Sequence, residues 1–115
     1  MVVTKILYML WVSDMARAVG FYRDVMGLAV RSQSPGWSEL TLGDSTIALH
    51  VGRNEKQHMS GLSFEVDNID AACREIGAAG GSILNPPHDG DFPGLRLADV
   101  ADQDGNRMQL GQQGS

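Results

Sequence analysis

The sequence is poor in three features that would point to particular functions. It has one cysteine, Cys73, which excludes an internal disulfide and suits a reducing, cytoplasmic environment. Lysine and arginine total 9 against 14 aspartates and glutamates, so no excess of cations is left to neutralise nucleic-acid phosphates. Apolar runs are too short to span a bilayer, and the stretch 6–12 lacks a small-residue cleavage site, so we expect neither membrane insertion nor secretion.

What is present is typical of one globular domain. The chain has 115 residues, of which 43% are hydrophobic and 20% are charged. A chain of this length can bury a stable core without disulfide bonds or bound metal ions. The chain also repeats itself at an offset of 54, where Val12–Val19 aligns with Val66–Cys73. In each copy a strand ends at a valine, a polar residue (Asp14 or Asn68) takes the helix N-cap position, and an amphipathic run follows.

The repeat predicts a single domain, 1–115, made of two modules. The first covers about 1–52 and the second about 59–115, with a polar connector at 52–58. Each reads as strand, helix and three strands, with helices at 15–26 and 69–78 and later strands at 28–32, 37–42, 46–51, 82–84, 95–100 and 107–111.

Glycine and proline predict the connections between these elements. Gly27 stands where a helix needs a left-handed C-terminal residue, and Asp104-Gly105 predicts a tight hairpin turn. Residues 85–94 contain three prolines and two glycines, which favours a longer irregular loop of the kind that borders binding sites.

Alternation along the strands separates a packed face from an open one. Tyr8, Leu10 and Val12 share one face, and the residues 54 positions later are also apolar, as expected for packing under a helix. The opposite face is mixed: Leu7, Met9, Trp11, Ala48, His50, Gly61, Ser63, Glu65, Arg107 and Gln109. The predicted fold is α+β, two βαβββ modules forming a curved mixed sheet around a concave pocket.

Two motifs connect this pattern to a known family. Phe21–Leu28 reads Phe-Tyr-x-x-x-x-Gly-Leu, and Asp102–Leu110 reads Asp-x-Asp-Gly-Asn-x-x-x-Leu. With the repeat, these motifs make nearly the whole chain resemble the vicinal oxygen chelate superfamily, which includes glyoxalases, extradiol dioxygenases and bleomycin-resistance proteins. The resemblance implies paired βαβββ modules, and we expect a homodimer.

The resemblance also implies metal ligands in the first and last strands of each module. Those positions here hold Leu7, Ala48, Gly61 and Gln109. Three of the four have no side-chain donor, and a lone amide is a weak ligand for a divalent ion. We therefore expect no metal and no other cofactor, as in the metal-free, bleomycin-resistance-like branch. A displaced metal site built from His50, Glu65 and Gln109 is the alternative.

Eight residues are candidates for contact with a small-molecule ligand: Met9, Trp11, Trp37, His50, Ser63, Glu65, Arg107 and Gln109. Trp11 offers a flat surface for stacking an aromatic or cationic group, and serves equally as a pocket filler. Trp37 is a candidate wall, although the alternation of its strand leaves its face undecided. Glu65 suits an ammonium or guanidinium ligand, or an internal ion pair with Arg107.

The favoured hypothesis is a metal-independent binding protein that sequesters a cationic or aromatic drug and confers antibiotic resistance. The rival is a glyoxalase- or dioxygenase-family enzyme with the displaced metal site, or with His50 or Glu65 as a general base. A pure interaction module is a third reading, and it predicts a filled concavity. No residue is assigned a catalytic role, and whether the chain catalyses a reaction stays open.

Overall fold

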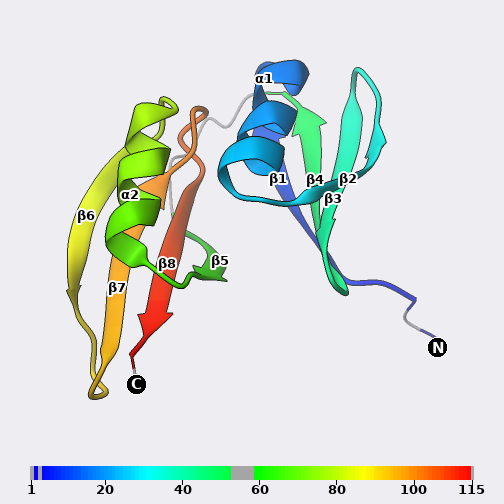
Figure 1. Ribbon diagram of the computed structural model, residues 1–115. Coiled ribbons are helices and arrows are strands. Elements are labelled where there is room, and N and C mark those ends of the chain that lie inside the picture. The colour runs from blue at the N-terminus through cyan, green and yellow to red at the C-terminus, as the bar shows by residue number, and fades with distance from the viewer. Residues whose placement is uncertain (1, 3, 53–58, 115) are drawn as a thin grey trace. The chain divides into compact units, whose positions relative to one another are not determined.

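The computed structural model describes residues 2, 4–52 and 59–114, so the predicted connector lies, apart from Gly52, outside the described residues. The chain divides into two compact units, Met1–Glu55 and Lys56–Ser115, called here the first and second module (Figure 1). The first contains β1 (Leu7–Val12), α1 (Met15–Gly20), η1 (Phe21–Val25), β2 (Ala29–Gln33), β3 (Trp37–Leu42) and β4 (Ser45–Val51). The second contains β5 (Met59–Glu65), α2 (Ile69–Ala78), β6 (Ser82–Asp89), β7 (Leu95–Ala101) and β8 (Arg107–Gln113).

Each module holds a four-stranded mixed sheet. The strand orders are β1-β4-β3-β2 and β5-β8-β7-β6. In both sheets the first strand runs parallel to the last, and the remaining pairs are antiparallel. The structure therefore confirms the predicted α+β fold of two βαβββ modules.

The helix of each module packs on its own sheet, where the core lies. In the first module Leu10, Val12, Leu40 and Leu49 are 3% exposed or less. In the second, α2 buries Ile69, Cys73 and Ile76, and the strands bury Val100, Met108 and Leu110. Burial, with a smaller effect from Asp70, raises the pKa of the Cys73 thiol. Among the described residues, no helix is long and apolar enough to cross a membrane.

Both helices begin at the predicted caps. Asp14 Oδ1 accepts from the Arg17 backbone N–H at 3.0 Å, and Asn68 Oδ1 accepts from that of Ala71 at 3.0 Å. These bonds satisfy amides that have no partner in the first turn of a helix. The sequence therefore predicted both starting points correctly.

The first helix changes geometry halfway, so the continuous α-helix predicted for 15–26 is wrong in its second half. Beyond Gly20 the chain forms η1, a π-helical turn in which the Met26 N–H donates to the Phe21 carbonyl at 3.1 Å. The wider turn brings two successive aromatic residues into the core, where Phe21 is 4% exposed and Tyr22 0%. Gly27 then takes the predicted left-handed conformation, with φ 78°.

Strand β6 extends to Asp89, beyond the predicted 82–84, and it includes Pro86 and Pro87. It is an edge strand, and its register with β7 shifts between Ile83 and Asn85 and again between Asn85 and His88. Edge strands and bulges tolerate proline because no ladder hydrogen bond is required there. The irregular loop predicted for 85–94 is therefore wrong in its first half, and only 90–94 connects the two strands.

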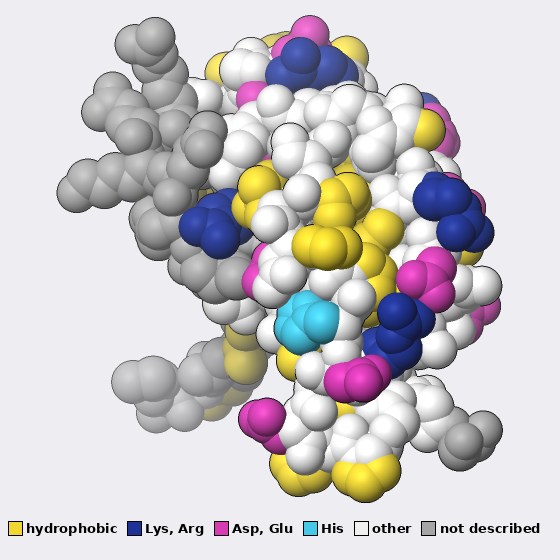
Figure 2. Space-filling view, turned by 90° about the vertical axis from the view of Figure 1, so that its left-hand side faces the viewer, with side chains coloured by type: hydrophobic (Ala, Val, Ile, Leu, Met, Phe, Trp, Pro, Cys, Tyr) yellow, Lys and Arg dark blue, Asp and Glu magenta, His cyan; other side chains and the backbone are white. Residues whose placement is uncertain are grey.

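The side of the second module that carries β6 and α2 presents a mixed surface. Figure 2 shows hydrophobic side chains in the middle of this side, with acidic and basic side chains around them. Ile83 and Leu84 are 37% and 46% exposed, while Arg96 pairs with Asp70 at 2.8 Å. Exposed hydrophobic side chains are common on the surface of folded proteins, and Ile83 and Leu84 are only partly exposed.

The loop 102–106 between β7 and β8 is organised by one buried carboxylate. Asp102, 4% exposed, accepts from the backbone N–H groups of Asp104 and Asn106, both at 2.9 Å. Its second oxygen accepts from Asn106 Nδ2 at 2.8 Å. A hairpin does connect β7 to β8, but its turn is centred one residue earlier than predicted, on Gln103-Asp104, where the Gly105 N–H donates to the Asp102 carbonyl at 3.1 Å. The Asp-x-Asp-Gly-Asn motif has a structural role in this hairpin.

Replacing Asp102 by Ala should therefore destabilise the protein. The change removes three accepted hydrogen bonds and leaves their donors without that partner, which should lower the free energy of unfolding by about 3 kcal/mol. Urea unfolding followed by circular dichroism measures this. Asp91→Ala, at an exposed position in the 90–94 loop, is the matched control and should change it by less than about 0.5 kcal/mol. Equal effects of the two changes would contradict the role given to Asp102.

Candidate functional site

Three aromatic side chains line up across the first sheet. Trp11 on β1 and Trp37 on β3 are both register partners of His50 on β4. The His50 ring centroid lies 4.5 Å from that of Trp11 and 5.6 Å from that of Trp37. Paired residues on neighbouring strands point to the same face of a sheet, so Trp37 lies on the face that carries Trp11 and His50. These three side chains are called the aromatic row.

The Trp11 ring lies directly on the backbone of Gly52. A Cβ atom at Gly52 would stand 2.6 Å from Trp11 Cε3 and 2.7 Å from Cζ3, closer than such atoms can approach. Glycine is therefore required for the ring to lie where it does. Along β1, Met9 borders the row and is 37% exposed, and its partner Ala48 is buried.

At the other end of the row, a hydrogen-bonded carboxylate fixes Trp37. The Trp37 indole Nε1 donates to Glu39 Oε2 at 3.0 Å, and Lys5 Nζ donates to Glu39 Oε1 at 2.6 Å. The hydrogen bond from Lys5, followed by that from Trp37, lowers the pKa of the Glu39 carboxyl. The sequence reading missed Lys5, Glu39 and Gly52 as site residues, although Glu39 alternates in step with Trp37.

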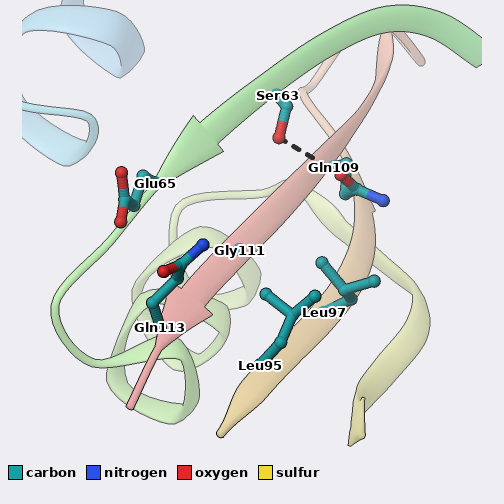
Figure 3. A pocket seen from close by; sticks show the side chains of 7 residues that line it. All are labelled: Ser63, Glu65, Leu95, Leu97, Gln109, Gly111 and Gln113. Carbon is teal, nitrogen blue, oxygen red and sulfur yellow. Dashed lines mark hydrogen bonds between the residues drawn. The ribbon is translucent and has the colours of Figure 1, made fainter. Parts of the chain in front are cut away.

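The second module carries a hollow on its sheet, with a volume of about 330 Å³ (Figure 3). It is lined by Ser63, Glu65, Leu95, Leu97, Gln109, Gly111 and Gln113. The Ser63 hydroxyl donates to Gln109 Oε1 at 3.2 Å, which joins β5 to β8 across the top of the view. Polar groups and two leucines thus face the same space.

Seven of the eight candidate residues fall into two groups. Met9, Trp11, Trp37 and His50 lie on one face of the first sheet, and Ser63, Glu65 and Gln109 line the hollow of the second. Arg107 does not line it, although it lies on the same face, two positions before Gln109. The sequence reading missed Leu95, Leu97 and Gln113 as lining residues, and placed Gly111 on this face without assigning it a role.

The predicted ion pair between Glu65 and Arg107 is wrong. Glu65 pairs in register with Gly111, whereas Arg107 pairs with Met59, four positions further back along β8. At about 3.3 Å per residue this separates the two backbone positions by roughly 13 Å, too far for direct contact. Strand alternation correctly placed both side chains on one face, but the distance along the strand keeps them apart.

The positions implied as metal ligands do not fit a metal ion. Leu7, Ala48 and Gly61 have no donor atom in their side chains, and the Oε1 atom of Gln109 already accepts from Ser63. Among the described residues, no group of three His, Cys, Asp or Glu side chains is placed to hold an ion.

Comparison with known proteins connects this geometry to a family. Residues 6–110 match the sequence model of the glyoxalase/bleomycin resistance protein/dioxygenase superfamily. A comparison with curated protein sequences finds no match.

Several solved structures are similar to the whole chain. A glyoxalase/bleomycin resistance protein/dioxygenase family enzyme from Burkholderia phytofirmans PsJN is 20% identical with a TM-score of 0.80, over 92% of this chain and 95% of that one. TnmS3, an antibiotic binding protein from Streptomyces sp. CB03234, is 25% identical with a TM-score of 0.75, over 98% of both chains. The fosfomycin resistance protein FosX from Mesorhizobium loti is 18% identical with a TM-score of 0.77, over 100% and 95%.

Trp37 should report the titration of Glu39. The pKa of Glu39 in the folded protein lies below its ordinary 4.5. The hydrogen bonds that the Glu39 carboxylate accepts therefore stabilise the folded protein above pH 4.5, and this stabilisation is lost as the pH falls through the lowered pKa. In an NMR titration from pH 5 to 2.5, below the usual histidine range of about 6.5, the Trp37 indole N–H signal should shift with a midpoint below pH 4.5.

Glu39→Gln is the matched control for this titration. Its amide oxygen can still accept from Trp37, so the indole signal should stay close to its original position while its acid shift disappears. A midpoint at or above pH 4.5 in the unaltered protein would contradict the arrangement.

Proposed function

The chain belongs to the glyoxalase/bleomycin resistance protein/dioxygenase superfamily, and within that family we propose that it binds a planar aromatic small molecule without a metal and without transforming it. The observation that carries this proposal is the aromatic row, Trp11–His50–Trp37, on the face of the first sheet opposite the packed core. Partly exposed Trp11, 36% accessible, is a surface for a flat ligand.

The row supports stacking because its members are held in place before any ligand arrives. Trp11 rests on Gly52, His50 lies between the two indoles, and Trp37 is anchored by Glu39. A surface ordered in advance loses little side-chain entropy on binding. Stacked aromatic pairs contribute about 0.5–1.5 kcal/mol beyond the area that they bury, and cation–π contacts contribute at least as much when desolvated.

One of the similar solved structures supports a role in binding a small molecule. TnmS3, whose description is an antibiotic binding protein, shares this fold over 98% of the chain at 25% identity. TnmS3 is therefore a precedent for antibiotic binding on such a scaffold. The resemblance to the fosfomycin resistance protein from Mesorhizobium loti, at 18% identity, concerns the fold alone.

Removing Trp37 should weaken binding of planar aromatic compounds. Two probes of opposite charge, the cation proflavine and the anion anthraquinone-2-sulfonate, test shape and charge separately. With the better probe, Trp37→Ala should raise the Kd about tenfold, the loss expected for one stacked ring. Fluorescence anisotropy measures proflavine binding, and calorimetry measures binding of the anthraquinone.

Phe92→Ala is the matched control, because it removes an aromatic ring that is 71% exposed in the 90–94 loop. Its Kd should equal that of the unaltered protein. Chromatography should recover the probe unchanged after prolonged incubation. An equal loss in both variants would contradict the role of the row, and a chemically altered probe would favour the enzyme hypothesis.

The protein should also carry no stoichiometric metal. Leu7, Ala48 and Gly61 provide no ligand atoms, so protein purified without chelator should contain far less than one ion per chain. Elemental analysis tests this, followed by calorimetric titration with Ni²⁺, Zn²⁺ and Fe²⁺ on the same sample. One tightly held ion per chain would mean that the ligand positions lie elsewhere, and would contradict metal-independent binding.

A further inference from the structure

We propose that the hollow of the second module is a site for an ammonium group carried on an apolar body, with Glu65 as the residue that holds the cation. The site lies wholly on the sheet of the second module and uses none of the residues of the aromatic row. It therefore extends the proposed function without depending on it. Four features of the hollow lead to this assignment.

Gly111, which has no side chain, is one of the residues that line the hollow. On β8, Gly111 is the register partner of both Glu65 on β5 and Leu97 on β7, so it forms the floor between them. A Cβ atom there would stand 3.6 Å from Leu97 Cδ2, an ordinary contact, and Gly111 is not one of the glycines with positive φ. Neither backbone geometry nor crowding requires glycine at this position. Its effect is to leave space.

Among the lining residues that the structure describes, Glu65 is the only ionisable one. The ion pairs within the described part of the chain do not include it, and Arg107 lies four positions away along β8. Asp99 on β7 is the register partner of Gln109 and lies on the same face, although it does not line the hollow. An exposed carboxylate at the border of a hollow can still accept a charge-assisted hydrogen bond from a cationic donor.

The amide of Gln109 is oriented by its neighbour. Because the Ser63 hydroxyl donates to Oε1, the NH₂ group of Gln109 points away from Ser63, as Figure 3 shows. This leaves two N–H donors for a carbonyl or hydroxyl of a ligand, and Gln113 supplies a second amide at the floor.

The remaining lining is apolar. Leu95 and Leu97 lie opposite Glu65, across Gly111 (Figure 3). A volume of about 330 Å³ is at the small end of the range for ligand sites, roughly 300–1,000 Å³. The site thus suits a compact amine whose hydrocarbon part covers the two leucines while its ammonium reaches Glu65.

Phenethylammonium chloride is a suitable probe, with sodium 3-phenylpropanoate as a control of nearly equal size and opposite charge. In an NMR titration of the ¹⁵N-labelled protein, the ammonium compound should shift the side-chain amide signals of Gln109 and Gln113 and the backbone signal of Gly111. The carboxylate should leave them unchanged. Binding should weaken as sodium chloride is raised, because Glu65 is exposed to solvent.

Two substitutions separate charge from shape. Glu65→Gln keeps the size of the side chain and should weaken binding about fivefold, whereas Gly111→Val should abolish it by filling the floor. Asp44→Asn, in the exposed turn between β3 and β4, removes one negative charge elsewhere and should have no effect. A dispersed ¹⁵N spectrum establishes that each variant is folded, and Gly111→Ala is a milder version expected to give a partial loss.

The proposal is overturned if both probes shift the same signals, or if Glu65→Gln and Gly111→Val bind like the unaltered protein. It is also overturned if the shifts map to Trp11 and Trp37, which would support the aromatic row instead. Loss of proflavine binding in Trp37→Ala with intact amine binding would separate the two sites.

Discussion

Burial of one sheet face under its own helix is the constraint on which each module depends. Leu10, Val12, Leu40 and Leu49 are almost completely buried. Successive strand residues alternate in direction, so this packing forces Trp11, Trp37 and His50 to the opposite face. A one-residue slip in register would exchange the two sets. Since each buried aliphatic side chain contributes about 1.5–3 kcal/mol, such a slip would cost several kcal/mol. The residues on the face opposite the helix are thus placed there by core formation.

Much of this arrangement follows from local rules and was predictable. The starting points of both helices could be predicted from the repeat and from the capping residues. An aspartate or asparagine directly before an amphipathic run can accept a hydrogen bond from the first turn of the helix, and both do so here. Alternation placed Trp11, His50, Ser63, Glu65 and Gln109 correctly on the open faces, since side-chain direction in a strand depends on sequence position alone.

The missing parts depend on contacts between residues distant in sequence. No local pattern reveals that Lys5 reaches Glu39 across 34 positions, or that Gly52 lies under Trp11. Residues Phe21–Val25 form a π-helical turn, although their sequence is equally compatible with an α-helical one. The π-helical turn buries both Phe21 and Tyr22, and this burial is seen only in the folded structure. Gly111 looked like an ordinary strand glycine. In the structure it lies between Glu65 and Leu97 on the neighbouring strands. This position cannot be predicted without the register of all three strands.

The irregular outer strand of the second module has a consequence for how these molecules behave at high concentration. A sheet edge normally exposes a regular row of amide and carbonyl groups that another chain can extend. In β6, Pro86 and Pro87 remove two amide donors, and two register shifts interrupt the spacing of the remainder. An incoming strand would find neither a continuous ladder nor a flat surface. The residues that make this segment look like a loop in the sequence therefore protect the edge of the sheet against edge-to-edge aggregation.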